Sequence, residues 1–154
     1  MKLAIIGSRD ITDVDIEKYI PDGVTEIVSG GAKGIDTLAK QYAIDNNIKY
    51  VEFTPDYSRF KKGAPLKRNQ EIAKYADAAL VFWNRRSKGT KHTINCFELL
   101  QKEIIKITIL ETAGEDTKEL CNEIAAELGA EPVQAIGSKF TIYRRSKNNP
   151  KIEL

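Results

Sequence analysis

The sequence predicts an α/β protein with a Rossmann-like, mostly parallel sheet, helices on both faces, and an extension made by a C-terminal helix and a β-hairpin. Three observations predict this class. Short apolar, β-branched segments alternate with segments that carry apolar residues at helical spacing, which indicates right-handed βαβ units. Polar turns that contain glycine follow three of the predicted strands. Near the C-terminus, two strand-like segments flank Gly137-Ser138, a hairpin signal.

Five apolar segments are predicted to form the parallel strands. They are residues 2–6, 25–28, 48–53, 78–83 and 104–110. Residues 2–6 and 78–83 are nearly continuous apolar runs, which are typical of strands that are buried on both faces.

The segments between these strands are predicted to supply the helices. Asp13 is expected to cap a helix that runs through Tyr19. Further helices are expected at residues 37–44, from residue 67 to near residue 75, and from the turn at 84–93 to residue 102. Residues 54–65 are predicted to be a polar loop that either closes over a ligand or simply connects the elements.

The last third of the chain is predicted to add a helix, a hairpin and a tail. Leu120, Ile124 and Leu128 trace one helical face, and Gly129 ends that helix. The hairpin strands are expected at residues 132–136 and 139–143, followed by a basic, mobile tail over residues 144–151.

Composition limits the classes of function. The 154 residues, 42% hydrophobic and 30% charged, suit one continuous domain with a buried core. A net charge of +2 is too balanced to require nucleic acid. The single histidine excludes a multi-histidine metal site, and Cys96 and Cys121 are expected to be buried, reduced thiols. No apolar run has membrane-spanning length, so we expect a cytoplasmic protein, monomeric or homodimeric, with no membrane partner.

The segment 29–36 (Ser-Gly-Gly-Ala-Lys-Gly-Ile-Asp) joins a predicted strand to a predicted helix. Glycine lets the backbone approach a ligand closely, and the free N–H groups at a helix N-terminus favour anions. A plain glycine turn explains the segment equally well. However, similar turns follow the first strand at Gly7-Ser8-Arg9 and the fourth strand at 84–93. The carboxyl ends of parallel strands meet at one edge, so the turns together predict a site for a phosphate or a nucleotide.

Polar side chains near these turns complete the predicted site. Arg68 offers a planar donor fork for phosphate and Asn69 can read a base or ribose edge, although a solvated helix face would look the same. Ser87 and Thr90 can donate to phosphate or cap a helix, and capping is the default. The predicted ligand-binding residues are Gly7, Ser8, Arg9, Gly30, Gly31, Ala32, Gly34, Asp36, Arg68, Asn69, Trp83, Ser87, Lys88, Gly89, Thr90 and His92.

Residues 1–100 resemble the SLOG superfamily, and in particular its small YspA/YpsA-like branch. The resemblance rests on residues 5–9, 29–36, 68–72, 76–77, 82–83 and 87–94. These Rossmann-like proteins are related to the DNA-processing protein DprA and to the LOG phosphoribohydrolases. The resemblance implies a bound nucleotide or derivative, such as AMP, ADP-ribose or an NAD-like molecule, with no cofactor required. The LOG hydrolases carry a glutamate after a glycine-rich turn. Lys91-His92-Thr93 stand there in this chain, so the resemblance does not imply hydrolysis.

Residues 97–154 resemble the second half of a YhbY-like CRM domain, which binds ribosomal and intron RNA. The resemblance rests on residues 103–107, 133–137, 142–144 and 151–154. Ser87-Lys88-Gly89-Thr90 replaces the glycine-bounded RNA-contacting loop of that family. The resemblance therefore implies weak, mostly electrostatic RNA binding. The cations available for it are Lys139, Arg144, Arg145, Lys147 and Lys151.

The two resemblances meet within one predicted β-turn-α-β unit, without a linker, which suggests a natural or engineered chimera that shares this unit. Three hypotheses follow. The preferred one is a nucleotide-binding module; the others are an RNA-binding module and a chimeric or designed chain without selected activity. An enzyme ranks below these hypotheses, because no set of nucleophile, base and orienting group is evident in the sequence.

Overall fold

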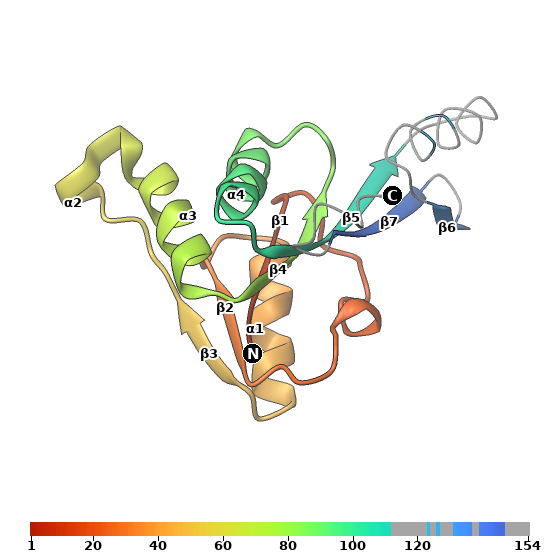
Figure 1. Cartoon of the computed structure of the whole chain (residues 1–154), viewed down its shortest axis with the longest axis horizontal. Helices are drawn as coiled ribbons and strands as arrows, with labels where there is room; N and C mark the ends of the chain where they lie inside the picture. Colours follow the sequence, from red (N-terminus) through yellow and green to blue (C-terminus); the bar gives the residue numbers. More distant parts are fainter. Residues whose placement is uncertain (112–122, 124–125, 127–130, 137–138, 147–154) are drawn as a thin grey trace.

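The computed structural model describes residues 1–111, 123, 126, 131–136 and 139–146, with side chains up to residue 109 and at 123 and 126. Seven strands form one sheet in the order β3-β2-β1-β4-β5-β7-β6 (Figure 1). The first five strands of that order are parallel, and β7 and β6 are antiparallel to their neighbours. The strands are β1 (Lys2–Gly7), β2 (Glu26–Ser29), β3 (Lys49–Glu52), β4 (Ala78–Trp83), β5 (Glu103–Glu111), β6 (Glu131–Ile136) and β7 (Lys139–Ser146).

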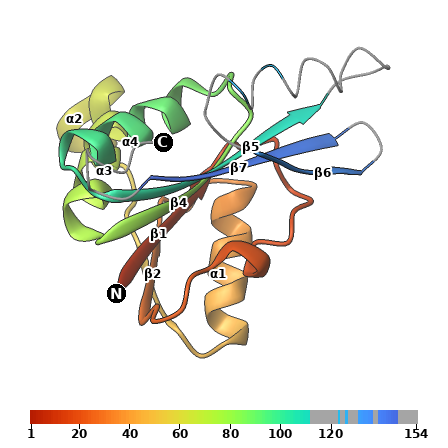
Figure 2. The ribbon, with the colours of Figure 1, turned by 45° about the vertical axis from the view of Figure 1, so that its right-hand side comes forward.

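Helices cover both faces of the parallel part of the sheet (Figure 2). The helical elements are η1 (Glu17–Tyr19), α1 (Ile35–Asp45), α2 (Tyr57–Phe60), η2 (Lys61–Gly63), α3 (Ala64–Tyr75) and α4 (Lys88–Leu99). One buried cluster joins α1 and the segment before η1 to the sheet, and a second joins α3 and α4 to the opposite face. These features confirm the predicted Rossmann-like α/β class.

The sheet forms because its central strands are apolar on both sides. Along β1, Leu3 and Ile5 belong to the cluster under α1, while Ala4 and Ile6 belong to the cluster under α3 and α4. This alternation follows from the two-residue period of a strand. The apolar runs in the sequence therefore identified the parallel strands correctly.

Strand β5 belongs to both halves of the sheet. It pairs in parallel with β4 from Ala78↔Glu103 to Trp83↔Thr108. On its other side it pairs antiparallel with β7, from Ile104↔Ser146 to Glu111↔Lys139. Strand β6 lies at an edge of the described sheet. An edge strand tolerates a proline such as Pro132, because one of its sides has no neighbouring strand that needs the missing N–H donor.

Three local predictions were wrong. Residues 13–16 are not helical, and no side chain caps η1, so Asp13 does not act as predicted. Ile11 and Ile16 are both buried, although five residues place two side chains about 140° apart on a helix. An irregular path lets both of these side chains reach the core.

The predicted loop at 54–65 instead contains α2, η2 and the beginning of α3. Asp56 caps α2, because its Oδ1 accepts a hydrogen bond from the backbone N–H of Arg59 at 3.2 Å. Pro65 occupies the first turn of α3, where it costs no helical hydrogen bond.

The third correction concerns the C-terminal region, where β7 extends to Ser146. Arg144 and Arg145 consequently lie in a strand and not in a tail. The pairing of β6 with β7 confirms the hairpin strands. The expected helix over residues 120–128 (apart from Glu123 and Ala126, which are helical), the turn at 137–138 and the tail at 147–154 lie outside the described residues.

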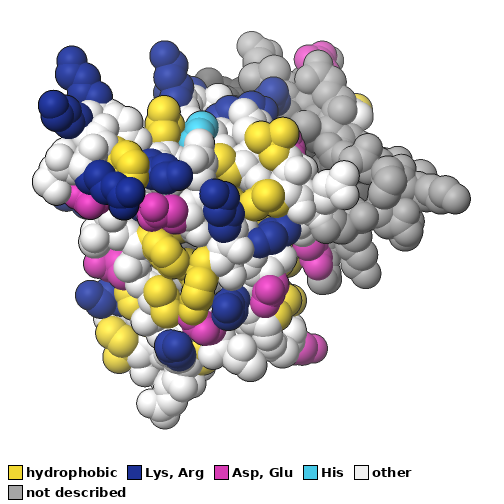
Figure 3. All heavy atoms as spheres, turned by 60° about the vertical axis from the view of Figure 1, so that its left-hand side comes forward, with side chains coloured by type: hydrophobic (Ala, Val, Ile, Leu, Met, Phe, Trp, Pro, Cys, Tyr) yellow, Lys and Arg dark blue, Asp and Glu magenta, His cyan; other side chains and the backbone are white. Residues whose placement is uncertain are grey.

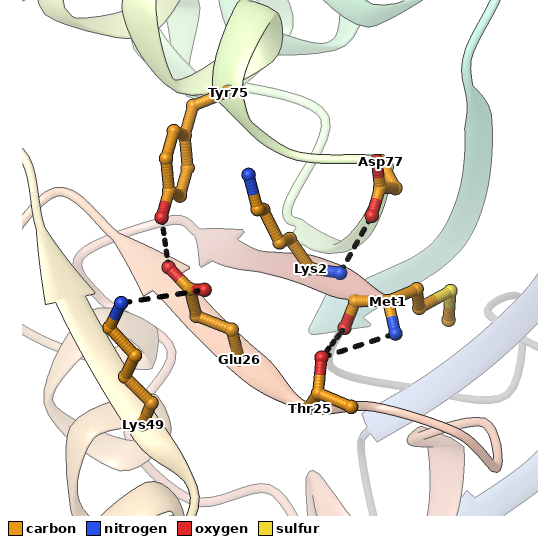
Figure 4. A network of polar contacts seen from close by, with 7 residues as sticks. All are labelled: Met1, Lys2, Thr25, Glu26, Lys49, Tyr75 and Asp77. Carbon is orange, nitrogen blue, oxygen red and sulfur yellow. Dashed lines mark hydrogen bonds and ion pairs between the residues drawn. The ribbon is translucent and has the colours of Figure 1, made fainter.

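A polar network closes the amino ends of the strands, opposite the predicted site (Figure 4). The Tyr75 hydroxyl donates to the buried carboxylate of Glu26, and Lys49 lies 3.9 Å from the same carboxylate. The backbone N–H of Lys2 donates to Asp77 at 2.8 Å. Within the described residues, no helix is both long and apolar enough to cross a membrane.

Candidate functional site

A pocket of about 130 Å³ lies at the carboxyl ends of the parallel strands. From β1 the chain proceeds outward to β2 and β3 and then returns to place β4 on the other side of β1. Such a reversal point is where open α/β sheets bind ligands. The lining residues are Ile6, Gly7, Arg9, Gly30, Ala32, Asp36, Pro65, Leu66, Arg68, Asn69, Ile72, Ser87, Gly89, Thr90 and Thr93.

Arg68, from the second turn of α3, reaches across the pocket to the turn after β2. Its Nη1 donates to the carbonyl of Gly30 at 2.8 Å and to that of Phe53 at 3.4 Å, and its Nε donates to Asn69 Oδ1 at 3.0 Å. Its Nη2 has no hydrogen-bond partner among the described residues, and no described carboxylate lies within ion-pair distance. A half-buried guanidinium with two free donors is suited to an anion.

Burial lowers the pKa of Arg68 from its ordinary value, and the carboxylate of Asp36 opposes this shift. Arginine nevertheless stays protonated in proteins, so the pocket keeps its positive charge.

Asp36, in the first turn of α1, is 5% exposed and accepts a hydrogen bond from the backbone N–H of Ala32 at 3.0 Å. Burial raises its pKa, while the Ala32 hydrogen bond and the Arg68 charge act in the opposite direction. A carboxylate at this position already complements the helix dipole of α1. One donor of the predicted anion cradle is thus paired within the chain.

The turn between β4 and α4 is held by its own side chains. Asn84 Oδ1 accepts hydrogen bonds from the N–H groups of Arg86 and Ser87, both at 2.8 Å. Ser87 caps α4, because its Oγ accepts hydrogen bonds from the N–H of Thr90 at 3.3 Å and from the Thr90 hydroxyl at 3.0 Å. This capping is the default role predicted for Ser87. The N–H groups of Lys88 and Gly89, in the first turn of α4, have no acceptor within the helix.

A chain of polar contacts runs from Arg68 in the pocket through Asn69 to His92 and Cys96 on α4. The Arg68 Nε donates to Asn69 Oδ1, which turns the amide nitrogen toward His92 Nδ1 at 3.3 Å. Nδ1 therefore accepts, and in a neutral ring the proton lies on Nε2. Cys96, a buried free thiol, lies 3.8 Å from the same Nδ1, and burial raises the pKa of that thiol.

Ten of the sixteen predicted ligand-binding residues line the pocket, namely Gly7, Arg9, Gly30, Ala32, Asp36, Arg68, Asn69, Ser87, Gly89 and Thr90. The other six are Ser8, Gly31, Gly34, Trp83, Lys88 and His92. A Cβ on Gly31 would lie 2.6 Å from Glu52 Cδ, and one on Gly34 would lie 2.7 Å from the Arg9 carbonyl oxygen. Both glycines therefore face protein atoms.

Of the remaining residues, Ser8 and Trp83 are engaged elsewhere. Ser8 is buried and accepts a hydrogen bond from the N–H of Asn84 at 3.2 Å, and the Trp83 indole donates to the Ser87 carbonyl at 3.1 Å. Both side chains therefore support the turn between β4 and α4.

Sequence reasoning missed five lining residues, Ile6, Pro65, Leu66, Ile72 and Thr93. Four of them are apolar and carried only the signal of core or loop residues. Thr93 follows Gly89 by one helical turn and donates to its carbonyl at 3.1 Å, a spacing that could have indicated the shared face.

Of the five cations that the sequence offers for RNA contact, Lys139, Arg144 and Arg145 lie on the described backbone of β7. In the register of β5 and β7, Lys139 pairs with Glu111 at one end, whereas Arg144 and Arg145 pair with Lys106 and Ile105 toward the other. Lys147 and Lys151 lie outside the described residues.

Within the described part of the chain, no group of three or more His, Cys, Asp and Glu side chains is placed to hold a metal ion.

The fold and the pocket define a Rossmann-like α/β protein with a pocket at the carboxyl edge of its sheet. Comparison with known families is consistent with that class. Residues 1–60 match the YspA, cpYpsA-related SLOG family, and residues 94–144 match the CRS1 / YhbY (CRM) domain. These two matches confirm the predicted pair of resemblances, and residues 61–93 lie in neither.

One curated relative is the probable RNA-binding protein YqeI of Bacillus subtilis (strain 168). It is 32% identical over 53 residues, which are 34% of this chain. The chain spans about half of the length of that relative, 55%. No solved structure matches the chain.

Proposed function

We propose that the pocket binds the phosphate of a nucleotide or a nucleotide-derived ligand. The observation that carries this proposal is the guanidinium of Arg68, half-buried in the pocket, with Nη2 unpaired among the described residues. Gly89, in the first turn of α4, lines the same pocket. The unpaired N–H groups of that turn therefore add the positive end of a helix dipole to the site. The match of residues 1–60 to a SLOG family supports the same class of ligand.

The charges of the pocket favour a ligand with two different ends. Asp36 repels a phosphate but accepts hydrogen bonds from hydroxyl groups, while Arg68 and α4 attract the phosphate. A nucleotide carries both a phosphate and sugar hydroxyl groups. The volume of 130 Å³ is below the roughly 300–1,000 Å³ of pockets that enclose drug-sized ligands. The phosphate and part of the sugar occupy the pocket, and the base lies over its rim.

A thermal-shift screen tests this function. AMP, ADP-ribose, NAD and inorganic phosphate are added separately to the full chain, because a ligand that binds only the native state raises the unfolding temperature by mass action. The proposal expects a shift with at least one nucleotide and a smaller shift with phosphate. No shift with any of the four at saturating concentration would reject it.

A second candidate function is weak RNA binding through the C-terminal part. The match of residues 94–144 to the CRM domain and the similarity to YqeI favour it. Lys139, Arg144, Arg145 and Lys147 would supply phosphate contacts that fall off with salt. An RNA titration of the double variant Arg144→Ala/Arg145→Ala tests this candidate. If these arginines contact phosphates, the variant should bind RNA more weakly, and its affinity should depend less on salt.

A further inference from the structure

The positive charge of the chain is concentrated in one segment. Residues 57–92 contain ten of the 24 lysines and arginines but only two of the 22 aspartates and glutamates. The ten cations are Arg59, Lys61, Lys62, Lys67, Arg68, Lys74, Arg85, Arg86, Lys88 and Lys91. The rest of the chain is therefore net negative, although the whole carries only +2.

The fold brings these cations to one side of the molecule. They come from α2, η2, α3, the turn after β4 and the first turn of α4, and α3 and α4 together line the pocket. Figure 3 shows lysine and arginine side chains gathered over the upper part of this face. Eight of the ten are exposed, and none forms an ion pair with any described residue. A surface left unneutralised in this way attracts polyanions.

Aromatic rings lie among the cations. The Tyr57 side chain is 60% exposed on α2. The Phe60 ring lies 5.1 Å from the Arg59 guanidinium and 5.8 Å from Lys67 Nζ. Exposed rings within a basic surface offer planes on which unpaired bases stack, whereas the bases of a duplex are already stacked on one another.

We propose that this surface, formed by residues 57–92 and called here the basic face, binds a single-stranded polynucleotide. Its cations contact the phosphates and the Tyr57 ring stacks on a base. Most of the basic face lies in residues 61–93, outside both family matches. It is also distinct from the C-terminal cations on β7, and it does not require the pocket to hold a free nucleotide.

The test measures fluorescence anisotropy of a labelled oligouridine, an oligodeoxythymidine and a duplex of equal length, with the full chain over a range of salt. Lys62→Ala/Arg86→Ala removes two exposed cations from the basic face. The matched control Lys18→Ala/Lys40→Ala removes two exposed cations from η1 and α1, on the other face of the sheet. The first pair should lower the slope of log affinity against log salt by about 1.4, at ~0.7 per phosphate contact of a single strand. The control pair should leave it unchanged.

Tyr57→Leu separates stacking from charge. It should weaken single-strand binding by about 5- to 150-fold, the range for one stacked base, without changing the salt slope. Binding of either single strand supports the proposal, and a preference between them identifies the sugar. Equal losses in both double variants, tighter binding to the duplex, or no binding at low salt would overturn it. So would a loss confined to Arg144→Ala/Arg145→Ala, which would assign the interaction to the C-terminal part.

Discussion

The guanidinium of Arg68 lies directly against the backbone of Gly30. The distance from Nη1 to the Gly30 carbonyl oxygen is 2.8 Å, and a Cβ added to Gly30 would lie 2.5 Å from the same nitrogen. Any other residue at position 30 would displace the arginine from its place in the pocket. The glycine of one turn thus sets the position of a cation that comes from a helix 38 residues further along the chain.

Gly30→Ala should therefore impair ligand binding without unfolding the protein. The atom in the way is the end of a flexible side chain, so the cost in stability is small while the arginine loses its position. We expect a loss in nucleotide affinity that approaches that of Arg68→Ala. Gly63→Ala is the matched control, because a Cβ there meets nothing within 4 Å. Retained affinity in Gly30→Ala, measured by calorimetry, would show that this contact does not organise the site.

Lys102 is predicted to stabilise the junction between α3 and β5. Its Nζ donates to the carbonyls of Ala73 at 2.6 Å, Lys74 at 2.9 Å and Ala76 at 2.7 Å, at the C-terminal end of α3. Lys102→Met should lower the free energy of unfolding by about 1–3 kcal/mol, because it leaves part-buried carbonyls without a donor. Urea unfolding measures the change, with the exposed Lys33→Met as a control. Equal midpoints for the two variants would contradict the prediction.

Asp36 is predicted to make stability depend on pH. Its pKa is raised by burial, so the native state keeps a proton that the unfolded state releases as the pH rises above 3.8. The free energy of unfolding therefore falls between 3.8 and the raised pKa, and the cost persists at neutral pH. Asp36→Asn, which stays neutral, should be stabilised relative to the parent at pH 7 but not at pH 3. Urea unfolding at both values tests this, and a gain of the same size at pH 3 would contradict it.

The whole chain is predicted to unfold as one cooperative unit. Strand β5 is hydrogen-bonded to β4 on one side and to β7 on the other, so the part similar to SLOG proteins and the part similar to CRM domains share a sheet. The fluorescence of Trp83 and a probe attached near Phe140 should report the same transition in urea. Two separated transitions would show that the parts fold independently, as expected of a chimera of autonomous pieces.

The parallel strands and the sheet edge that carries the pocket could be predicted from the sequence, because both depend on local patterns. Apolar runs such as residues 78–83 mark buried strands, and each glycine-containing turn was found directly after its strand. The sequence also indicated where α4 begins, because Ser87 is its N-terminal cap.

The rest depends on contacts between distant segments. Nothing near Arg68 in the sequence indicates that the carbonyls of Gly30 and Phe53 would accept its hydrogen bonds. The helix expected at 13–19 failed for a similar reason, since the demand to bury Ile11 and Ile16 together overrides the local capping signal.

Calorimetric titration of AMP, ADP-ribose and NAD into the parent protein and into Arg68→Ala tests the central claim most directly. Arg68 lines the pocket with a half-buried guanidinium whose Nη2 has no hydrogen-bond partner among the described residues. The parent should bind at least one of these nucleotides, and the variant should lose about 1.5–3 kcal/mol of binding free energy, the range for a hydrogen bond to a charged group. Equal affinity in the two proteins, or no heat of binding in the parent, would contradict the account.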